Sequence, residues 1–391
     1  MTKLDAVYAF AVAFAVAALL TPPTARFARR VGAVDQPKAR GLGVASTPLL
    51  GGLAIGAGTL VAALLFVETS AKTHDRLVGI LAGCVFITFV GAIDDRFDLH
   101  PAVKLAGQIV AATIPVAAGV EVGNITLPFA GAIDFGSAGG PVTVIGLVAM
   151  MNVVNFSDGV DGLAAGVCAI SAAAFSVIAF DLHREYAAIL AACTAGGAAG
   201  FLIHNFPPAS IYMGDCGANL LGLLLGCVAV EGAVKTQAAL ALIFPLVVLA
   251  VPFLDTTFVI LKRMKYRRKF YVADANHFHH RFSRIGFSER KTVLYLYAWT
   301  LLLGGFAVAL RFIPYSDDHG HLHAGWSTVV AVLALVVAAA SVYLVYVLEI
   351  LKLRRLSAMR LRRVRPETSH AEVDADVERQ IETGEFQALD R

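Results

Sequence analysis

The chain has 391 residues, of which 58% are hydrophobic and 16% are charged, and its formal net charge is +3 at pH 7. With a mean hydropathy of +0.71, the composition lies far from that of a soluble domain and predicts an integral membrane protein. We therefore expect a lipid bilayer, and no nucleic acid, as its surroundings.

Long apolar segments follow one another along the chain, and each approaches the roughly 17–25 residues that cross a bilayer as a helix. Their length excludes a barrel, whose strands would alternate over about ten residues. The expected fold class is an all-α polytopic membrane protein with about 11 transmembrane helices; the fifth and eighth segments are short enough to be tilted or partly re-entrant. The segments are 4–24, 48–67, 77–93, 102–120, 141–154, 162–181, 185–203, 217–231, 237–260, 293–313 and 326–350.

The distribution of basic residues predicts the orientation. If the N-terminus is periplasmic, all but six of the 32 Lys and Arg residues fall on the cytoplasmic side; the six are Lys3, Lys72, Arg76, Arg184, Lys235 and Arg311. We therefore expect a transmembrane domain over residues 1–353 and a charged cytoplasmic tail over 354–391 without a catalytic role. The expected location is the bacterial inner (cytoplasmic) membrane.

Disulfides are not expected. Five cysteines are an odd number, four of them lie inside apolar segments, and no C-x-x-C pair occurs; they are Cys84, Cys168, Cys193, Cys216 and Cys227. The Gly-rich segment 121–140 contains no basic residue and is interpreted as a periplasmic loop with a short hairpin.

Four polar islands interrupt the apolar segments, and the predicted topology places all of them on the cytoplasmic side. The first is Asp94-Asp95, whose adjacent carboxylates both stay ionised only if a cation is near; the alternative is a solvated helix end. Lys104 follows on the next segment, where it either snorkels to the surface or holds a phosphate.

The second island is NFSDGVDGL, residues 155–163. Asn155, Asp158 and Asp161 are spaced by three, so they would share one face of a helix, but Gly159 and Gly162 favour a break that brings backbone N–H groups close to a ligand. Polar groups at a membrane edge need partners, which favours a binding site over a simple turn.

The third and fourth islands are Gly214-Asp215 and residues 277–281. Asp215 precedes a long apolar segment, where it either caps the helix or helps to hold a hard cation or phosphate. The second sequence, HFHHR, lacks the spacing of a zinc site, and its basic setting favours phosphate binding over a plain membrane-surface loop. Its candidate residues are His277, His279, His280 and Arg281.

Together these motifs resemble the polyprenyl-phosphate N-acetylhexosamine-1-phosphate transferases (glycosyltransferase family 4), and the WecA/TagO-like branch more than the MraY branch. The similarity covers residues 20–310 and rests on Asp35-x-Pro37, GGLA from Gly51, Asp94-Asp95-Arg96 with Lys104, NFSDGVDGL, Met213-Gly214-Asp215 and the histidine motif. Two departures concern the choice of sugar: Ala218-Asn219 replaces the usual Ser, and Leu49-Leu50 replaces a basic residue before the glycine pair.

The resemblance implies roles for the candidate residues. Asp215 and Asn155 would bind Mg²⁺, for which Mn²⁺ is a conceivable substitute. Asp94 and Asp95 would act on the lipid phosphate, one of them as a general base. Asp161 would bind the uracil, Lys104 would bind the pyrophosphate, and Asp158 would contact the substrate. The phosphates would be bound by His277, His279, His280 and Arg281.

The implied reaction moves HexNAc-1-phosphate, above all GlcNAc-1-phosphate, from UDP-HexNAc to undecaprenyl phosphate and releases UMP, which starts a lipid-linked cell-envelope glycan. The first alternative is an MraY-type phospho-MurNAc-pentapeptide transferase, which the absence of P-x-H-H-H-[FY]-E disfavours. The second is a cation-coupled transporter, for which acids should lie at mid-bilayer depth, as only Asp255 does. The sequence does not determine the HexNAc, the downstream polymer or the oligomeric state, and it allows a homodimer.

Overall fold

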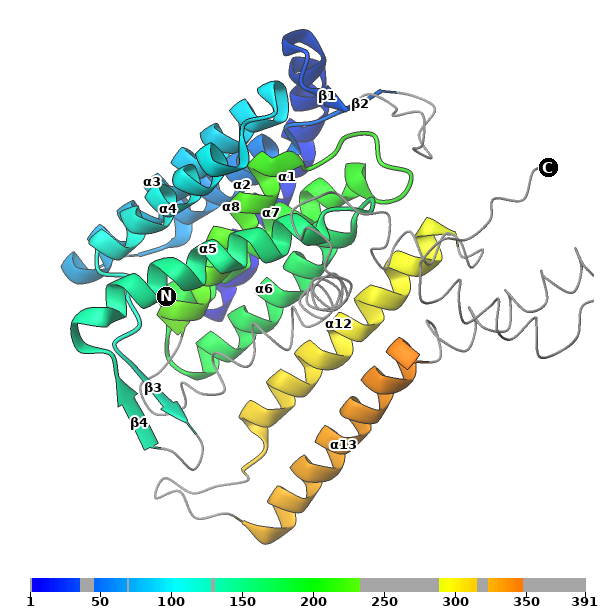
Figure 1. Cartoon of the computed structure of the whole chain (residues 1–391). Helices are drawn as coiled ribbons and strands as arrows, with labels where there is room; N and C mark the ends of the chain where they lie inside the picture. Colours follow the sequence, from blue (N-terminus) through cyan, green and yellow to red (C-terminus); the bar gives the residue numbers. More distant parts are fainter. Residues whose placement is uncertain are drawn as a thin grey trace, which may run out of the picture. The chain divides into compact units, whose positions relative to one another are not determined.

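The computed structural model describes residues 2–35, 46–68, 70–127, 131–232, 288–314 and 323–346. The chain divides into two compact units. The first carries residues 2–232 and 293–311 of the described part, and helix α13 (Ala324–Tyr346) belongs to the second. The first unit contains the site and is considered by itself (Figure 1).

The described residues form ten α-helices. Each falls on a predicted segment, while segment 237–260 lies outside the described residues. The helices of the first unit are α1 (Lys3–Val31), α2 (Gly51–Phe66), α3 (Ala71–Phe97), α4 (Pro101–Ala117), α5 (Gly139–Ser157), α6 (Leu163–Asp181), α7 (Glu185–Asn205), α8 (Gly214–Gly232) and α12 (Glu289–Phe312), whose ends pass into the second unit.

Seven of the described helices are long and apolar enough to cross a membrane, so the protein is a multi-pass membrane protein. The expectation that the fifth and eighth helices are short was wrong, because α5 and α8 have 19 residues each. Polar residues at their ends, such as Asn155 and Asp215, continue the helices beyond the apolar stretch. The shorter apolar helices are α2, α4 and part of α13.

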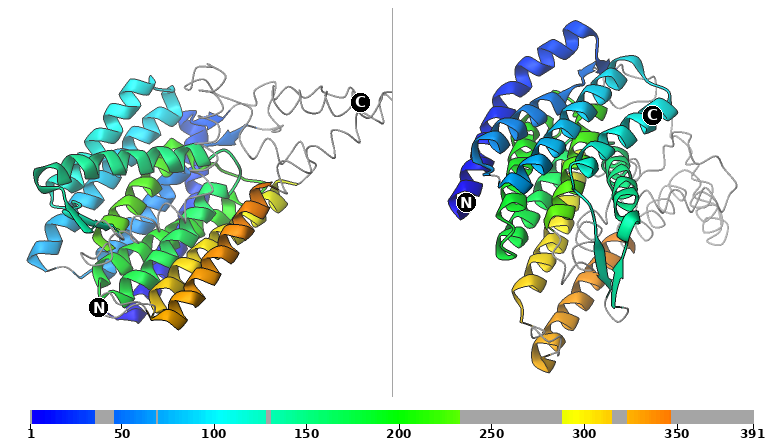
Figure 2. Two further views of the ribbon diagram at one scale, coloured as in Figure 1. Left: turned by 60° about the horizontal axis from the view of Figure 1, so that its bottom comes forward. Right: turned by 90° about the vertical axis from the view of Figure 1, so that its left-hand side faces the viewer.

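Two small antiparallel ladders complete the first unit. Strand β1 (Val34–Asp35) pairs with β2 (Thr47–Pro48), and β3 (Asn124–Leu127) pairs with β4 (Gly131–Asp134), which confirms a hairpin within segment 121–140. The two ladders lie at opposite ends of the helix bundle (Figures 1 and 2). All five cysteines are free and buried, as expected.

Small residues bring the helix backbones of this unit close together, as is common in membrane proteins. The second helix begins against the start of α8: the N–H of Gly51 donates to the carbonyl of Tyr212, and that of Gly52 to the carbonyl of Met213, both at 3.0 Å. A Cβ atom on Gly52 would collide with the backbone of Gly217. The glycine pair therefore lets α2 and α8 meet directly beside Asp215.

Replacing Gly52 by Ala should lower the free energy of unfolding by about 1–3 kcal/mol, because the added methyl overpacks a backbone-to-backbone contact. Thermal unfolding of the detergent-purified protein measures this loss. The matched control is Gly146→Ala on α5, where nothing lies within 4 Å of the new Cβ. A helical Gly→Ala change in open space should be neutral or stabilising by up to about 1 kcal/mol, so equal effects at both positions would contradict the packing argument.

Candidate active site

Three of the four polar islands meet at one end of the bundle. Helices α3, α5 and α7 end where α4, α6 and α8 begin, so Asp94-Asp95, residues 155–163 and Gly214-Asp215 all lie at that end. The prediction that these islands share one side is therefore confirmed. The fourth island, with His277, His279, His280 and Arg281, lies outside the described residues.

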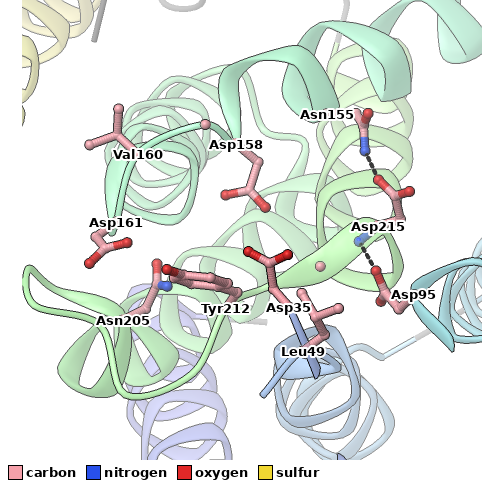
Figure 3. Close-up of a pocket in the computed structure, with 12 residues that line it drawn as sticks. Asp35, Leu49, Asp95, Asn155, Asp158, Val160, Asp161, Asn205, Tyr212 and Asp215 are labelled. Carbon is pink, nitrogen blue, oxygen red and sulfur yellow. Dashed lines mark hydrogen bonds between the residues drawn. The ribbon is translucent and has the colours of Figure 1, made fainter. Parts of the chain in front are cut away.

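A pocket of about 400 Å³ opens among these islands (Figure 3). Asn155, Asp215 and Asp95 lie at one end of it, which we call the phosphate end, and Asp161, Asn205 and Tyr212 lie at the other. Asp158 and Asp35 point into the space between them. Its lining residues are Asp35, Leu49, Asp95, Asn155, Asp158, Gly159, Val160, Asp161, Asn205, Tyr212, Gly214 and Asp215.

At the phosphate end, the carboxylate of Asp215 contacts two other side chains. One of its carboxylate oxygens accepts a hydrogen bond from the side-chain amide of Asn155, and the other pairs with the ammonium group of Lys104. Lys104 also pairs with Asp94 at 3.0 Å. Asp94 is only 7% exposed and accepts from the N–H of Leu99 at 2.8 Å. The first island is therefore not a solvated helix end, and Lys104 is neither snorkelling nor free.

Asp95 contacts different partners from Asp94 and caps helix α8 from a neighbouring helix. Its carboxylate accepts from the N–H of Asp215 at 2.7 Å and from the N–H of Cys216 at 3.2 Å. These N–H groups have no acceptor within a helix that begins at Gly214. Asp215 is therefore not the cap of its own helix, and its carboxylate is left for the pocket. Gly214 has φ +70°, and a Cβ there would collide with Asp95.

The NFSDGVDGL island forms a helix end and a tight turn. Helix α5 ends at Ser157 and α6 begins at Leu163, so the predicted break at the glycines is confirmed and the three polar residues do not share one helical face. Asp161 accepts from the N–H of Ala209 at 2.7 Å. The turn is also held from α12, where the hydroxyl of Tyr297 donates to the carbonyl of Gly162.

The pocket is strongly acidic. Five carboxylates line it, and none of the described lining residues is basic. Burial, followed by the charges of Asp215, Asp95 and Asp161, raises the pKa of Asp158 to about 8. Burial also raises the pKa of Asp161, against the hydrogen bond from Ala209. These raised pKa values show that further negative charge is unfavourable in this pocket, and a bound cation would relieve that repulsion.

Sequence reasoning gave no role to three polar residues of the pocket, Asp35, Asn205 and Tyr212. Asp35 reaches it because the β1–β2 ladder pairs Asp35 with Thr47. Asn205 joins two segments: its carbonyl accepts from the N–H of Gly162 at 3.0 Å, and its amide donates to the carbonyl of Ile211 at 2.9 Å. The polar Asn205 at the end of an apolar helix was a usable signal, whereas Tyr212 carried none.

The oxygen-rich site fits a hard divalent cation. Mg²⁺ is usually held by one or two carboxylates together with substrate phosphates and water, and the contacting pair Asp215 and Asn155 offers such a partial ligand set. Among the described residues, no group of three His, Cys, Asp or Glu side chains forms a complete metal site. The remaining ligands would therefore come from phosphate oxygens and water.

The fold and the pocket define a multi-pass membrane protein with an acidic pocket at one end of its helix bundle. The chain belongs to glycosyl transferase family 4. The profile of that family matches residues 77–233, the stretch that contains Asp94, Lys104, Asn155 and Asp215.

Curated relatives support this membership along most of the chain. A probable undecaprenyl-phosphate N-acetylglucosaminyl 1-phosphate transferase of Bacillus subtilis is 32% identical over 78% of this chain and 85% of its own length. A decaprenyl-phosphate N-acetylglucosaminephosphotransferase of Mycobacterium leprae is 34% identical over the same shares. A phospho-N-acetylmuramoyl-pentapeptide-transferase of Moorella thermoacetica is 31% identical over 77% of this chain and 96% of its own.

Proposed function

We propose that the protein transfers GlcNAc-1-phosphate from UDP-GlcNAc to undecaprenyl phosphate and releases UMP, as the first step of a lipid-linked cell-envelope glycan. The observation that carries the proposal is the cluster of Asp94, Lys104, Asn155 and Asp215 at one end of a membrane helix bundle. The names of the N-acetylglucosamine-phosphate transferases among its relatives support the choice of substrates.

The location of the pocket suits this pair of substrates. A polyprenyl phosphate keeps its chain in the bilayer and its phosphate at the surface, where a soluble nucleotide sugar meets it. The distribution of basic residues supports a pocket on the cytoplasmic side of the inner membrane, with the N-terminus periplasmic. We retain eleven spans over residues 1–353 and a cytoplasmic tail over 354–391 as part of the proposal.

In the reaction, an oxygen of the lipid phosphate forms a bond to the phosphorus that carries the sugar, and the bond from that phosphorus to UMP breaks. An ionised phosphate is already a nucleophile, so positioning and charge neutralisation do most of the work. Lys104 would pair with the pyrophosphate at the phosphate end, and Asp161 would bind the uracil at the other. Because Asp95 is engaged with the α8 N–H groups, its contacts favour a positioning role. Asp94 does not line the pocket and would act through its ion pair with Lys104.

Asp215 and Asn155 would hold Mg²⁺. When bound, the ion would offset the repulsion between the two phosphates and stabilise the charge on the departing UMP. Their mutual hydrogen bond fixes both side chains toward the pocket before any substrate arrives.

Two alternative functions, a pentapeptide transferase and a transporter, can be distinguished from the proposed one. A pentapeptide transferase would use UDP-MurNAc-pentapeptide, and relatives of that type match the chain at 31–32% identity. A transporter would be expected to place acids at mid-bilayer depth, whereas five acids of the described residues line the pocket at one end of the bundle. Asp255 lies outside the described residues.

The detergent-purified protein, given UDP-GlcNAc, undecaprenyl phosphate and Mg²⁺, should release UMP in a coupled assay, and EDTA should abolish the release because the pocket cannot neutralise two phosphates alone. A parallel panel of UDP-GlcNAc, UDP-GalNAc and UDP-MurNAc-pentapeptide decides the donor. UMP release with the pentapeptide donor alone would establish the alternative transferase, and no release with any donor would remove the enzyme interpretation.

A further inference from the structure

Three amide side chains form a hydrogen-bonded chain just below the phosphate end of the pocket. Asn152 of α5 donates to the carbonyl oxygen of Gln108 of α4 at 2.9 Å, and the amide nitrogen of Gln108 donates to the carbonyl oxygen of Asn219 of α8 at 2.7 Å. Asn219 in turn donates to the main-chain carbonyl of Asp215 at 2.8 Å. We call Asn152, Gln108 and Asn219 the amide ladder.

Each ladder residue lies one helical turn from Lys104, Asn155 or Asp215 on its own helix. Residues three or four positions apart share a helix face, so the ladder repeats, one turn deeper, the meeting of α4, α5 and α8 that forms the site. The pairs are Gln108 with Lys104, Asn152 with Asn155, and Asn219 with Asp215.

The ladder joins different helices, whereas several buried hydroxyls of the bundle bond within their own helix. The hydroxyls of Thr88 and Thr194 bond to carbonyls of their own helices, at 2.7 and 2.9 Å, and so place no constraint on a neighbour. Gln108 and Asn219 are each only 1% exposed. A slide of one helix by a single residue, about 1.5 Å, would leave buried amides without partners, which is costly.

We propose that Gln108 and Asn219 are positioning residues that fix the register of α4 against α8 and α5, and thereby hold Lys104, Asn155 and Asp215 in mutual contact. This role rests on the proposed function for its link to turnover. Gln108 and Asn219 would affect cation binding and the chemical step. They would not affect recognition of the nucleoside, because the ladder lies under the phosphate end alone.

The test compares wild-type protein with Gln108→Leu, which keeps the approximate size and removes both ladder bonds of Gln108. Two quantities are measured: Mn²⁺ affinity by electron paramagnetic resonance, without donor or lipid, and kcat and KM for UDP-GlcNAc. Loss of a side chain that orients a metal ligand typically costs about 10–100-fold in affinity or activity. We expect losses of that size in Mn²⁺ affinity and kcat, with KM changed by less than about threefold.

Two further variants separate positioning from mere stability. Gln108→Leu combined with Asn219→Leu leaves no orphaned amide, because Asn152 still donates to the carbonyl of Val148 at 2.8 Å. Replacing both partners by apolar groups can be nearly neutral for stability, so this double variant should recover the melting temperature while kcat and Mn²⁺ affinity stay low. Thr194→Val is the control for loss of a remote buried hydroxyl. It should leave kcat and Mn²⁺ affinity near their wild-type values.

Wild-type Mn²⁺ affinity and kcat in Gln108→Leu, or their recovery in the double variant, would overturn the positioning role. If Gln108→Leu does not fold, the Mn²⁺ affinity and kcat of the double variant decide whether the ladder has a positioning role. Absence of UMP release by the wild-type protein would instead overturn the proposed function, and the Mn²⁺ comparison would still decide the role of the ladder.

Discussion

Replacing Asp215 by Asn should reduce UMP release by on the order of 10³-fold, the scale on which loss of a single charge-stabilising group acts at a preorganised site. The substitution keeps the shape of the side chain but removes the negative charge that pairs with Lys104 and that would bind the cation. Helix α8 should stay folded, because Asp95 caps it through main-chain N–H groups that the substitution does not change.

Initial rates of UMP release at saturating Mg²⁺, with thermal unfolding of the same samples, measure this effect. The matched control is Asp98→Asn, at the exposed end of α3, with φ 52° and no part in the pocket lining. Asn tolerates that backbone conformation well, so rate and melting temperature should stay close to wild type. A rate for Asp215→Asn within tenfold of wild type would remove Asp215 from the centre of the site.

Replacing Lys104 by Met should damage both stability and turnover. The side chain of Asp94 is 5% exposed, and it would no longer be paired with the positive charge of Lys104. That charge would also no longer reduce the repulsion between the carboxylates of Asp94 and Asp215. Breaking a fully buried ion pair costs about 3–5 kcal/mol. Because the side chains of Lys104 and Asp215 are 24% and 27% exposed, we expect a smaller loss of about 1–3 kcal/mol, together with a fall in kcat of about 10²-fold or more.

A second substitution separates the two effects of Lys104→Met. Adding Asp94→Asn removes the unpaired buried charge, so the double variant should recover most of the melting temperature and none of the turnover. Thermal unfolding and UMP release are measured on both variants. Recovery of turnover in the double variant would show that Lys104 serves stability alone and does not act on the phosphates.

Much of the site could be predicted because the direction of each helix follows from the order of apolar segments. Consecutive spans run in opposite directions, so the ends that carry Asp94, Asn155 and Asp215 had to meet on one side wherever the helices packed. The ladder was also within reach: Gln108, Asn152 and Asn219 are polar residues inside apolar helices, each one turn from a site residue, and such residues usually have a role.

The different contacts of Asp94 and Asp95 could not be predicted from the sequence. Neighbouring residues on a helix point about 100° apart, and only the packing of α3 between α4 and α8 shows that Asp94 turns to Lys104 while Asp95 turns to the start of α8. The entry of Asp35 into the pocket likewise depends on a two-residue ladder with Thr47 that no periodicity indicates.

The sequence by itself therefore determined the membrane class, the positions of the described helices, the shared end of the three described polar islands and the identity of most residues around the pocket, because hydropathy and helix direction are local or cumulative along the chain. Only the tertiary structure decided which carboxylate contacts Asn155 and Lys104, which one caps α8 and which residues lie beneath them. Those choices depend on contacts between helices far apart in sequence, where a rotation of one residue exchanges one partner for another.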